Sequence, residues 1–167
     1  MRDYSECRCY VDHLVAEHRR LHRILRHMRA AIVSSVQPDV APSFAEVARI
    51  LGRLHDELEL HFTEEDEGGC LDEAVSRCPW LAPEVKRIEA EHPEILAEVN
   101  RLIDEANHLQ PTVQHQVAMQ QSFDRLYQRI RTHEKAENQL FAQGFGTNVN
   151  SVENDQPALN LRLLFDT

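Results

Sequence analysis

Two histidine–glutamate pairs in this sequence share one spacing. His61 precedes Glu65 by four residues, and His133 precedes Glu137 by the same interval, 72 positions further along the chain. Side chains four residues apart on a helix point off the same face. Imidazole and carboxylate together suit iron, manganese or zinc, whereas an iron–sulfur centre needs thiolates. The two pairs therefore predict metal binding from two helices.

Two further histidines complete the predicted set, and each follows a glutamate, as Glu17-His18 and Glu91-His92. Four histidines and two glutamates suit a dinuclear site. If both metals are iron, two carboxylates leave charge to be balanced by an oxo or hydroxo bridge, and zinc or manganese can substitute. The predicted metal ligands are His18, His61, Glu65, His92, His133 and Glu137.

Turn signals leave four long segments to carry these residues. Their apolar residues recur at alternating spacings of three and four, which is typical of bundle helices. Glycines are scarce and helix-forming residues abundant, so we expect an all-α fold. The turn signals are Gln37 to Pro42, Gly68-Gly69 with Cys78-Pro79 beyond, His108 to Thr112, and Gly144 to Gly146. Pro83 suits the first turn of the third helix, and Gly144 suits the end of the fourth.

The apolar pattern is interrupted at one level of each segment, where the histidines stand. Short loops make neighbouring helices antiparallel. At 1.5 Å per residue, His18 and His61 each lie about 22 to 27 Å from the loop they share, so they occupy one layer. The second hairpin repeats the first, which predicts a pseudo-twofold axis. We therefore predict an antiparallel up-down-up-down four-helix bundle over residues 1–145 and a tail over 146–167.

A simpler interpretation is that these histidines are hydrogen-bonded core residues, as a single histidine on an apolar stripe usually is. Six polar residues in one buried layer argue against it, because each would cost several kcal/mol in desolvation without a metal.

His22, one turn after His18, is either an extra ligand or proton donor, or an interface histidine. His13, His27, His108 and His115 are expected to be solvated. Glu64 and Asp66 are candidates for orienting the ligand imidazoles.

Charge and hydropathy narrow the class of protein. The net charge is −10 and no cluster of Lys and Arg stands free of acids, which disfavours nucleic acid as a partner. No stretch approaches 18 apolar residues, and the beginning of the chain has no apolar core for export. We therefore expect a cytoplasmic protein that does not associate with membranes.

The motifs, taken together, resemble the hemerythrin-like, or HHE cation-binding, domain. They are the two Glu-His pairs, HFTEEDE from His61 and HEKAENQLF from His133, and the resemblance covers roughly residues 10 to 144. It implies that His18 and His61 bind one iron, that His92 and His133 bind the other, and that Glu65 and Glu137 bridge them. It also implies a small diatomic ligand, O2 or NO, or peroxide.

Two positions depart from that family. Oxygen-carrying hemerythrins have a second histidine one turn after the first in the third helix, where this chain has Leu96, so the set is closer to di-iron domains that repair iron centres or handle nitric oxide. Pro93 follows His92 directly, and because proline removes a helical hydrogen bond we expect a kink or break there.

Several functions remain open at this stage. We expect ligand binding in oxygen, nitric oxide or oxidative-stress handling. The alternatives are an enzyme that repairs iron centres or reduces nitric oxide or peroxide, and an iron or redox sensor acting on a protein partner through the apolar end of the tail. A ferritin-like oxidase is disfavoured because no Glu-x-x-His motif has both of its residues on an apolar stripe. Four thiols, Cys7, Cys9, Cys70 and Cys78, either are unrelated or gather at one end of the bundle as a zinc or redox cluster.

Overall fold

The computed structural model describes residues 4–34, 44–110 and 112–146, and at 4–12, 15, 33 and 34 only the backbone. Within these residues all regular structure is helical and no strand occurs. The four long helices are α1 (Tyr4–Ser34), α2 (Phe44–Gly68), α4 (Ala82–His108) and α5 (Val113–Phe145). A short helix, α3 (Cys70–Arg77), and a 3-10 turn, η1 (Pro79–Leu81), connect α2 to α4.

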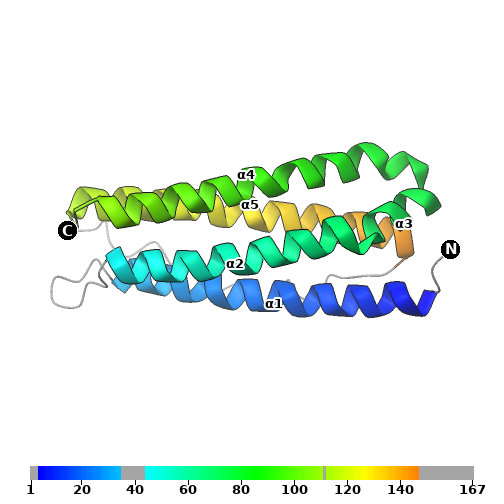
Figure 1. Cartoon of the computed structure of the whole chain (residues 1–167), viewed down its shortest axis with the longest axis horizontal. Coiled ribbons are helices and arrows are strands. Elements are labelled where there is room, and N and C mark those ends of the chain that lie inside the picture. Colours follow the sequence, from blue (N-terminus) through cyan, green and yellow to red (C-terminus); the bar gives the residue numbers. More distant parts are fainter. Residues whose placement is uncertain (1–3, 35–43, 111, 147–167) are drawn as a thin grey trace, which may run out of the picture.

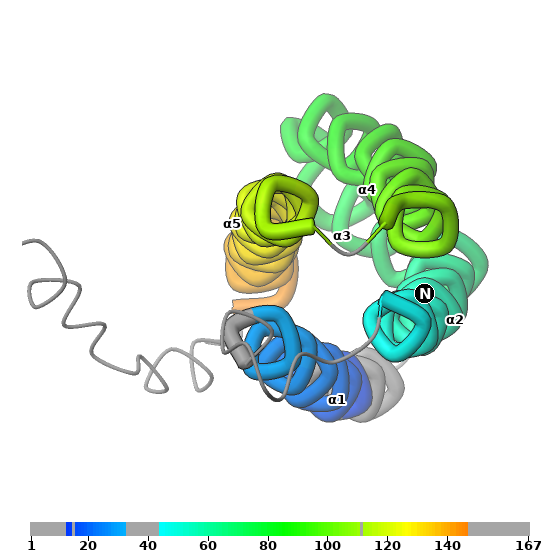
Figure 2. Tube along the Cα trace, turned by 90° about the vertical axis from the view of Figure 1, so that its left-hand side faces the viewer, coloured from blue at the N-terminus to red at the C-terminus, as the bar shows by residue number. Residues whose placement is uncertain are grey.

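The long helices run up, down, up and down along one axis (Figure 1). Seen end-on, they form a ring in which α1 and α4 lie diagonally opposite each other, as do α2 and α5 (Figure 2). Neighbours around this ring pack together, as α1 with α2, α2 with α4, α4 with α5, and α5 with α1. The predicted all-α four-helix bundle is confirmed.

Helix ends follow the local sequence in most places. Pro83 lies in the first turn of α4, as predicted. The hydroxyl of Thr112 accepts a hydrogen bond from the backbone N–H of His115 and so caps α5. The predicted stop at Gly144 is wrong, because α5 continues to Phe145 and is capped by Gly146, whose φ of +67° suits glycine.

Gly144 instead permits close packing between α5 and α3. A side-chain Cβ added at Gly144 would lie 2.9 Å from the Cβ of Ala74, which is too near for any residue larger than glycine. We expected the stretch after Gly68 to be a turn, and α3 is therefore an addition to the prediction. Gly69, with a φ of +70°, separates α2 from α3, and Leu71 and Ala74 bury the new helix against the bundle.

Pro93 does not break its helix. α4 is continuous from Ala82 to His108 with Pro93 inside it, so the expected break is absent. Proline removes the hydrogen bond that would reach the carbonyl of Glu89, four residues earlier. Pro93 lies on the exposed side of the helix, where water can satisfy a freed carbonyl, and the buried face with His92 is unaffected.

The apolar core is divided into two clusters along the bundle axis. One lies toward the α1–α2 and α4–α5 connections and includes Leu25, Leu54 and Phe123. The other lies toward α3 and includes Leu14 and Phe141. On α1, α4 and α5 the change from one cluster to the other occurs at the level of the predicted ligands, whereas α2 contributes only to the first cluster and α3 continues the second. The polar layer therefore lies between the two apolar clusters.

The proposed tail, 146–167, lies outside the described residues except for Gly146, and the division at residue 145 remains a prediction. Among the helices that the structure describes, none combines the length and the apolar character that a membrane crossing requires.

Candidate metal centre

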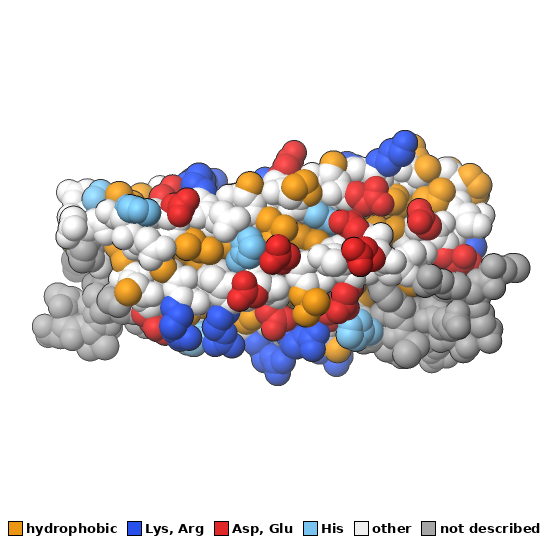
Figure 3. All heavy atoms as spheres, viewed as in Figure 1, with side chains coloured by type: hydrophobic (Ala, Val, Ile, Leu, Met, Phe, Trp, Pro, Cys, Tyr) orange, Lys and Arg blue, Asp and Glu red, His pale blue; other side chains and the backbone are white. Residues whose placement is uncertain are grey.

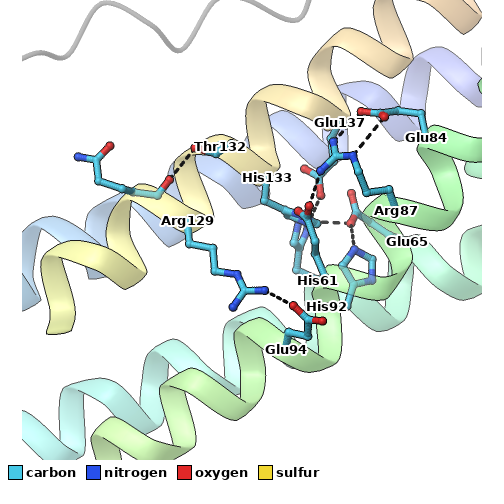
Figure 4. A network of polar contacts seen from close by, with 12 residues as sticks. His61, Glu65, Glu84, Arg87, His92, Glu94, Arg129, Thr132, His133 and Glu137 are labelled. Atoms are coloured by element: carbon cyan, nitrogen blue, oxygen red, sulfur yellow. Dashed lines mark hydrogen bonds and ion pairs between the residues drawn. The ribbon is translucent and has the colours of Figure 1, made fainter.

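Six polar side chains from four helices meet in the layer between the two apolar clusters. None is more than 2% exposed. Figure 4 shows His61 and Glu65 of α2, His92 of α4, and His133 and Glu137 of α5 converging on one point. His18 of α1 joins them, with its ring centroid 5.0 Å from that of His61. The six residues predicted from spacing are therefore brought together by the fold.

The potential ligand atoms form two groups that share both glutamates. His18 and His61 with Glu65 and Glu137 make one group, in which all the ligand atoms lie within 4.8 Å of one another. A second group, equally compact, contains His92 and His133 with the same two glutamates. Each group offers two imidazoles and two carboxylates.

Each glutamate contacts one histidine from each group. Glu137 Oε2 lies 3.3 Å from Nε2 of His18, and Glu137 Oε1 lies 2.5 Å from Nε2 of His133. In the same way, Glu65 Oε2 lies 3.7 Å from Nε2 of His61 and 3.4 Å from Nε2 of His92. A carboxylate placed between two groups in this way can bridge two cations.

None of these ligand atoms takes part in a hydrogen bond. The Nε2 atoms of all four histidines and both carboxylate oxygens of Glu65 and Glu137 are buried without a hydrogen-bond partner, even though they lie close together. Buried polar groups are normally paired, and each unpaired one costs about 1 to 3 kcal/mol or more. Eight such atoms facing one another fit a cation-binding site, because coordination would satisfy them all.

Three carboxylates outside the layer hold the histidine rings. Nδ1 of His61 lies 3.3 Å from Glu17 Oε2, and Nδ1 of His133 lies 2.9 Å from Glu91 Oε2. Nδ1 of His92 lies 3.0 Å from Asp66 Oδ1. An imidazole that donates its Nδ1–H to a carboxylate keeps the Nε2 lone pair for a metal.

The predicted role of Asp66 in orienting a ring therefore fits the structure, whereas Glu64 contacts His13, at 2.8 Å. His13, expected to be simply solvated, also lies 3.5 Å from Glu17. Sequence reasoning missed the orienting positions of Glu17 and Glu91. The sequence did carry a signal for these positions, because His18 and His92 each follow a glutamate directly.

Burial and mutual repulsion set the charges of the two central carboxyls. Burial raises the pKa of Glu65 well above its ordinary value, and the nearby Glu137 carboxylate raises it further. Burial also acts to raise the pKa of Glu137, but His133 and His18 outweigh it and hold that pKa well below its ordinary value. Without a cation, these shifts favour the proton on Glu65 and the negative charge on Glu137.

The imidazoles respond to the same carboxyls. Burial lowers the pKa of His92, and the adjacent His133 lowers it further. Burial acts in the same direction on His18 and His133, but Glu137 outweighs it and raises the pKa of both. A bound cation would replace the protons on which these shifts depend.

The surroundings of the two groups differ in polarity. The ring of Phe62 stacks on His92 at 4.2 Å and meets His133 edge-on at 5.4 Å. The position 72 residues later holds Glu134, a buried carboxylate on α5 whose Oε2 lies 2.7 Å from Nε2 of His22. His22 therefore pairs with Glu134 and joins neither group. The 72-residue repeat relates Glu134 to Phe62, but it does not predict that an acidic side chain replaces an apolar one there.

The alternative of a thiol cluster involves two cysteines of α1 and two near α3. The side chains of Cys7 and Cys9 are not among the described residues. Cys70 is buried and Cys78 is partly buried, and within the described chain neither forms a disulfide. Cys78 Sγ lies 3.7 Å from the carbonyl oxygen of Gln143.

Comparison with known proteins identifies the domain. The family described as the Hemerythrin HHE cation binding domain matches residues 9–142, which is most of the chain. No curated protein and no solved structure matches it. The resemblance seen in the motifs is confirmed at the level of the family.

Proposed function

The chain belongs to the hemerythrin HHE cation-binding family, and from that premise we propose that it holds two iron ions and binds a small diatomic ligand or peroxide beside them. In this proposal His18 and His61 bind one iron, and His92 and His133 bind the other. Glu65 and Glu137 bridge the two.

The observation that carries the proposal is the set of eight buried ligand atoms without hydrogen bonds. Their division into two groups that share both glutamates favours two cations over one. The donor set of imidazoles and carboxylates favours iron, with manganese or zinc as substitutes. Two irons held in this way would supply redox chemistry and an exchangeable coordination position.

The residues around the centre have defined tasks in this proposal. Glu17, Glu91 and Asp66 hold three rings with Nε2 directed inward, so the ligands are ordered before the metal arrives. The two apolar clusters above and below the layer exclude bulk water. Exclusion of water favours a small neutral ligand over a hydrated one.

We place ligand binding at the His92/His133 iron. Phe62 covers both of those rings, and Leu96, one turn after His92, packs partly buried against the same apolar cluster. The other half faces the polar pair His22 and Glu134. An apolar wall beside an unfilled position admits a diatomic molecule while discouraging water.

The test is the metal content and visible spectrum of the chain purified in air without chelator. Two irons per chain with charge-transfer bands that change on addition of azide or nitric oxide support the proposal. Tightly bound zinc, or a spectrum unaffected by either ligand, would overturn the ligand-binding role.

Two alternatives remain within the same site. Catalytic loss of nitric oxide or peroxide with a reductant present would indicate an enzyme, and restoration of a damaged iron centre would indicate a repair protein. Metal-dependent binding of a protein partner through residues 146–167 would indicate a sensor. Steady-state turnover and partner binding in the loaded and metal-free chain separate these roles.

A further inference from the structure

A groove rich in arginine lies between α1 and α2, outside the metal centre. It encloses about 300 Å³ and is lined by Arg20, Arg23 and His27 of α1, and by Ile50, Arg53 and Glu57 of α2. Figure 3 shows basic side chains gathered along the lower edge of the molecule, over α1. Three guanidinium groups and one imidazole line the groove together with one carboxylate, that of Glu57.

The positive charge of this groove is only partly compensated by carboxylates. Within the described chain, Arg23 and Arg53 form neither a hydrogen bond nor an ion pair. Arg20 Nη2 pairs with Glu17, but its Nε is buried without a hydrogen-bond partner and lies 3.8 Å from Glu57 Oε2. Like charges held together repel one another. In a chain with a net charge of −10, which has ten more acids than bases, such a grouping is a local feature that an anion would stabilise.

We propose that this groove binds a small phosphate-bearing anion. Guanidinium groups present parallel N–H donors that match phosphate oxygens, and three of them converge here. The volume is at the small end of the range for ligand pockets, enough for one phosphate and a short organic group. Ile24 and Ile50 supply apolar surface for that group. The acidic remainder of the molecule repels long polyanions, which favours a small ligand over nucleic acid.

The groove is connected to the layer of candidate ligands through one residue. Arg20 lines the groove, and its Nη2 donates a hydrogen bond to Glu17 Oε1 at 3.1 Å. The other oxygen of Glu17 lies 3.3 Å from Nδ1 of His61. An anion that draws the guanidinium of Arg20 toward itself weakens its contact with Glu17, and the hydrogen bond to His61 changes in response. Occupancy of the groove therefore modulates the centre, an effect that rests on the proposed function.

Binding is tested by calorimetry with inorganic phosphate and phenyl phosphate on the full chain as purified, at constant ionic strength. We expect saturable binding that is weakened at least about tenfold in the double variant Arg23→Gln/Arg53→Gln, because each substitution removes charged hydrogen bonds. Arg19→Gln is the matched control, since Arg19 is an exposed arginine of the same helix that does not line the groove. It should bind phosphate as the unaltered chain does.

Several outcomes would overturn the anion site. They are no saturable binding, an equal loss in Arg19→Gln, or an equal response to chloride. Tight binding of an oligonucleotide or of anionic lipid vesicles, with none of phosphate or phenyl phosphate, would overturn the assigned ligand class.

The connection to the centre is tested separately. Phosphate should shift the imidazole NMR signals of His61 in the metal-free chain, and the visible spectrum in the iron-loaded chain, and neither shift should occur in Arg23→Gln/Arg53→Gln. Phosphate binding without either shift would overturn the connection between the groove and the metal centre, while still supporting the anion site. Phosphate binding in a chain that never takes up iron would contradict the proposed function but support the proposed anion site in the groove.

Discussion

The carboxylate of Glu17 on α1 lies 3.3 Å from Nδ1 of His61 on α2, and so the residue before one candidate ligand orients a candidate ligand on the neighbouring helix. Glu91 of α4 repeats the relationship with His133 of α5 at 2.9 Å. Each Glu-His pair in the sequence therefore serves two helices at once. The glutamate reaches across the interface, and the histidine points into the layer.

Loss of an orienting carboxylate should weaken metal binding without abolishing it. We expect Glu17→Gln and Glu91→Gln to lower metal affinity by roughly 10- to 100-fold, because the imidazole loses its fixed tautomer and some basicity. Competition with a chelator measures the change. Glu59→Gln, at an exposed position of α2, is the control and should retain the original affinity. Unchanged affinity in both test variants would contradict the orienting role.

Removal of a candidate ligand should have a larger effect. We expect His61→Ala or Glu137→Ala to lower metal content and the melting temperature together, because each leaves the remaining buried ligand atoms unsatisfied and removes binding energy that is also folding energy. His55→Ala is a suitable control, since His55 belongs to neither group and contacts Asn100 near the surface. Two metals per chain and an unaltered melting temperature in both ligand variants would refute the assignment.

The stability of the metal-free chain should depend on pH through Glu65. Its pKa is raised in the folded state, so between the ordinary value of 4.5 and the raised value the folded chain binds more protons than the unfolded chain. The contribution of Glu65 to stability is therefore complete below pH 4.5 and is lost as the pH rises through the raised pKa.

Glu65→Gln removes this titration and should reverse the order of stability on metal binding. Without metal at neutral pH, the variant should melt at a higher temperature than the unaltered chain, because glutamine folds without either taking up a proton or burying a charge at this position. With metal, the unaltered chain should melt at the higher temperature, because its carboxylate is a ligand. Melting curves of both forms across pH, with Glu59→Gln as control, measure this. The same order with and without metal would contradict a ligand role for Glu65.

The sequence predicts more of the bundle than of its side-chain contacts. Apolar stripes and the spacing of His18, His61 and their repeats specify which helix faces are buried, and these determine the layer. Contacts between helices, such as His22 with Glu134, depend on rotations that periodicity does not encode.

Local signals can also have more than one meaning. Gly144 predicts a helix stop, but a glycine equally permits close approach, as it does here against Ala74. Pro93 predicted a break, but its position on the exposed side of α4 makes the lost hydrogen bond tolerable. In each case the deciding fact is what lies against that face, which is a property of the folded chain.

The last prediction concerns Leu96, which stands four residues after His92 as His22 stands four residues after His18. The half-site of His92 and His133 is bordered by Phe62, and Leu96 packs partly buried against the same apolar cluster. Position 96 therefore offers an apolar side chain and no imidazole that could act as a ligand.

In the iron-loaded chain, Leu96→His should supply a further imidazole and lower azide affinity by about tenfold or more, equivalent to about 1.4 kcal/mol. Azide titration followed by the charge-transfer absorption measures the change. Leu96→Met preserves the apolar volume and should bind azide as the unaltered chain does. Equal affinity in all three chains would place the ligand elsewhere and would direct attention to the polar half beside Glu134.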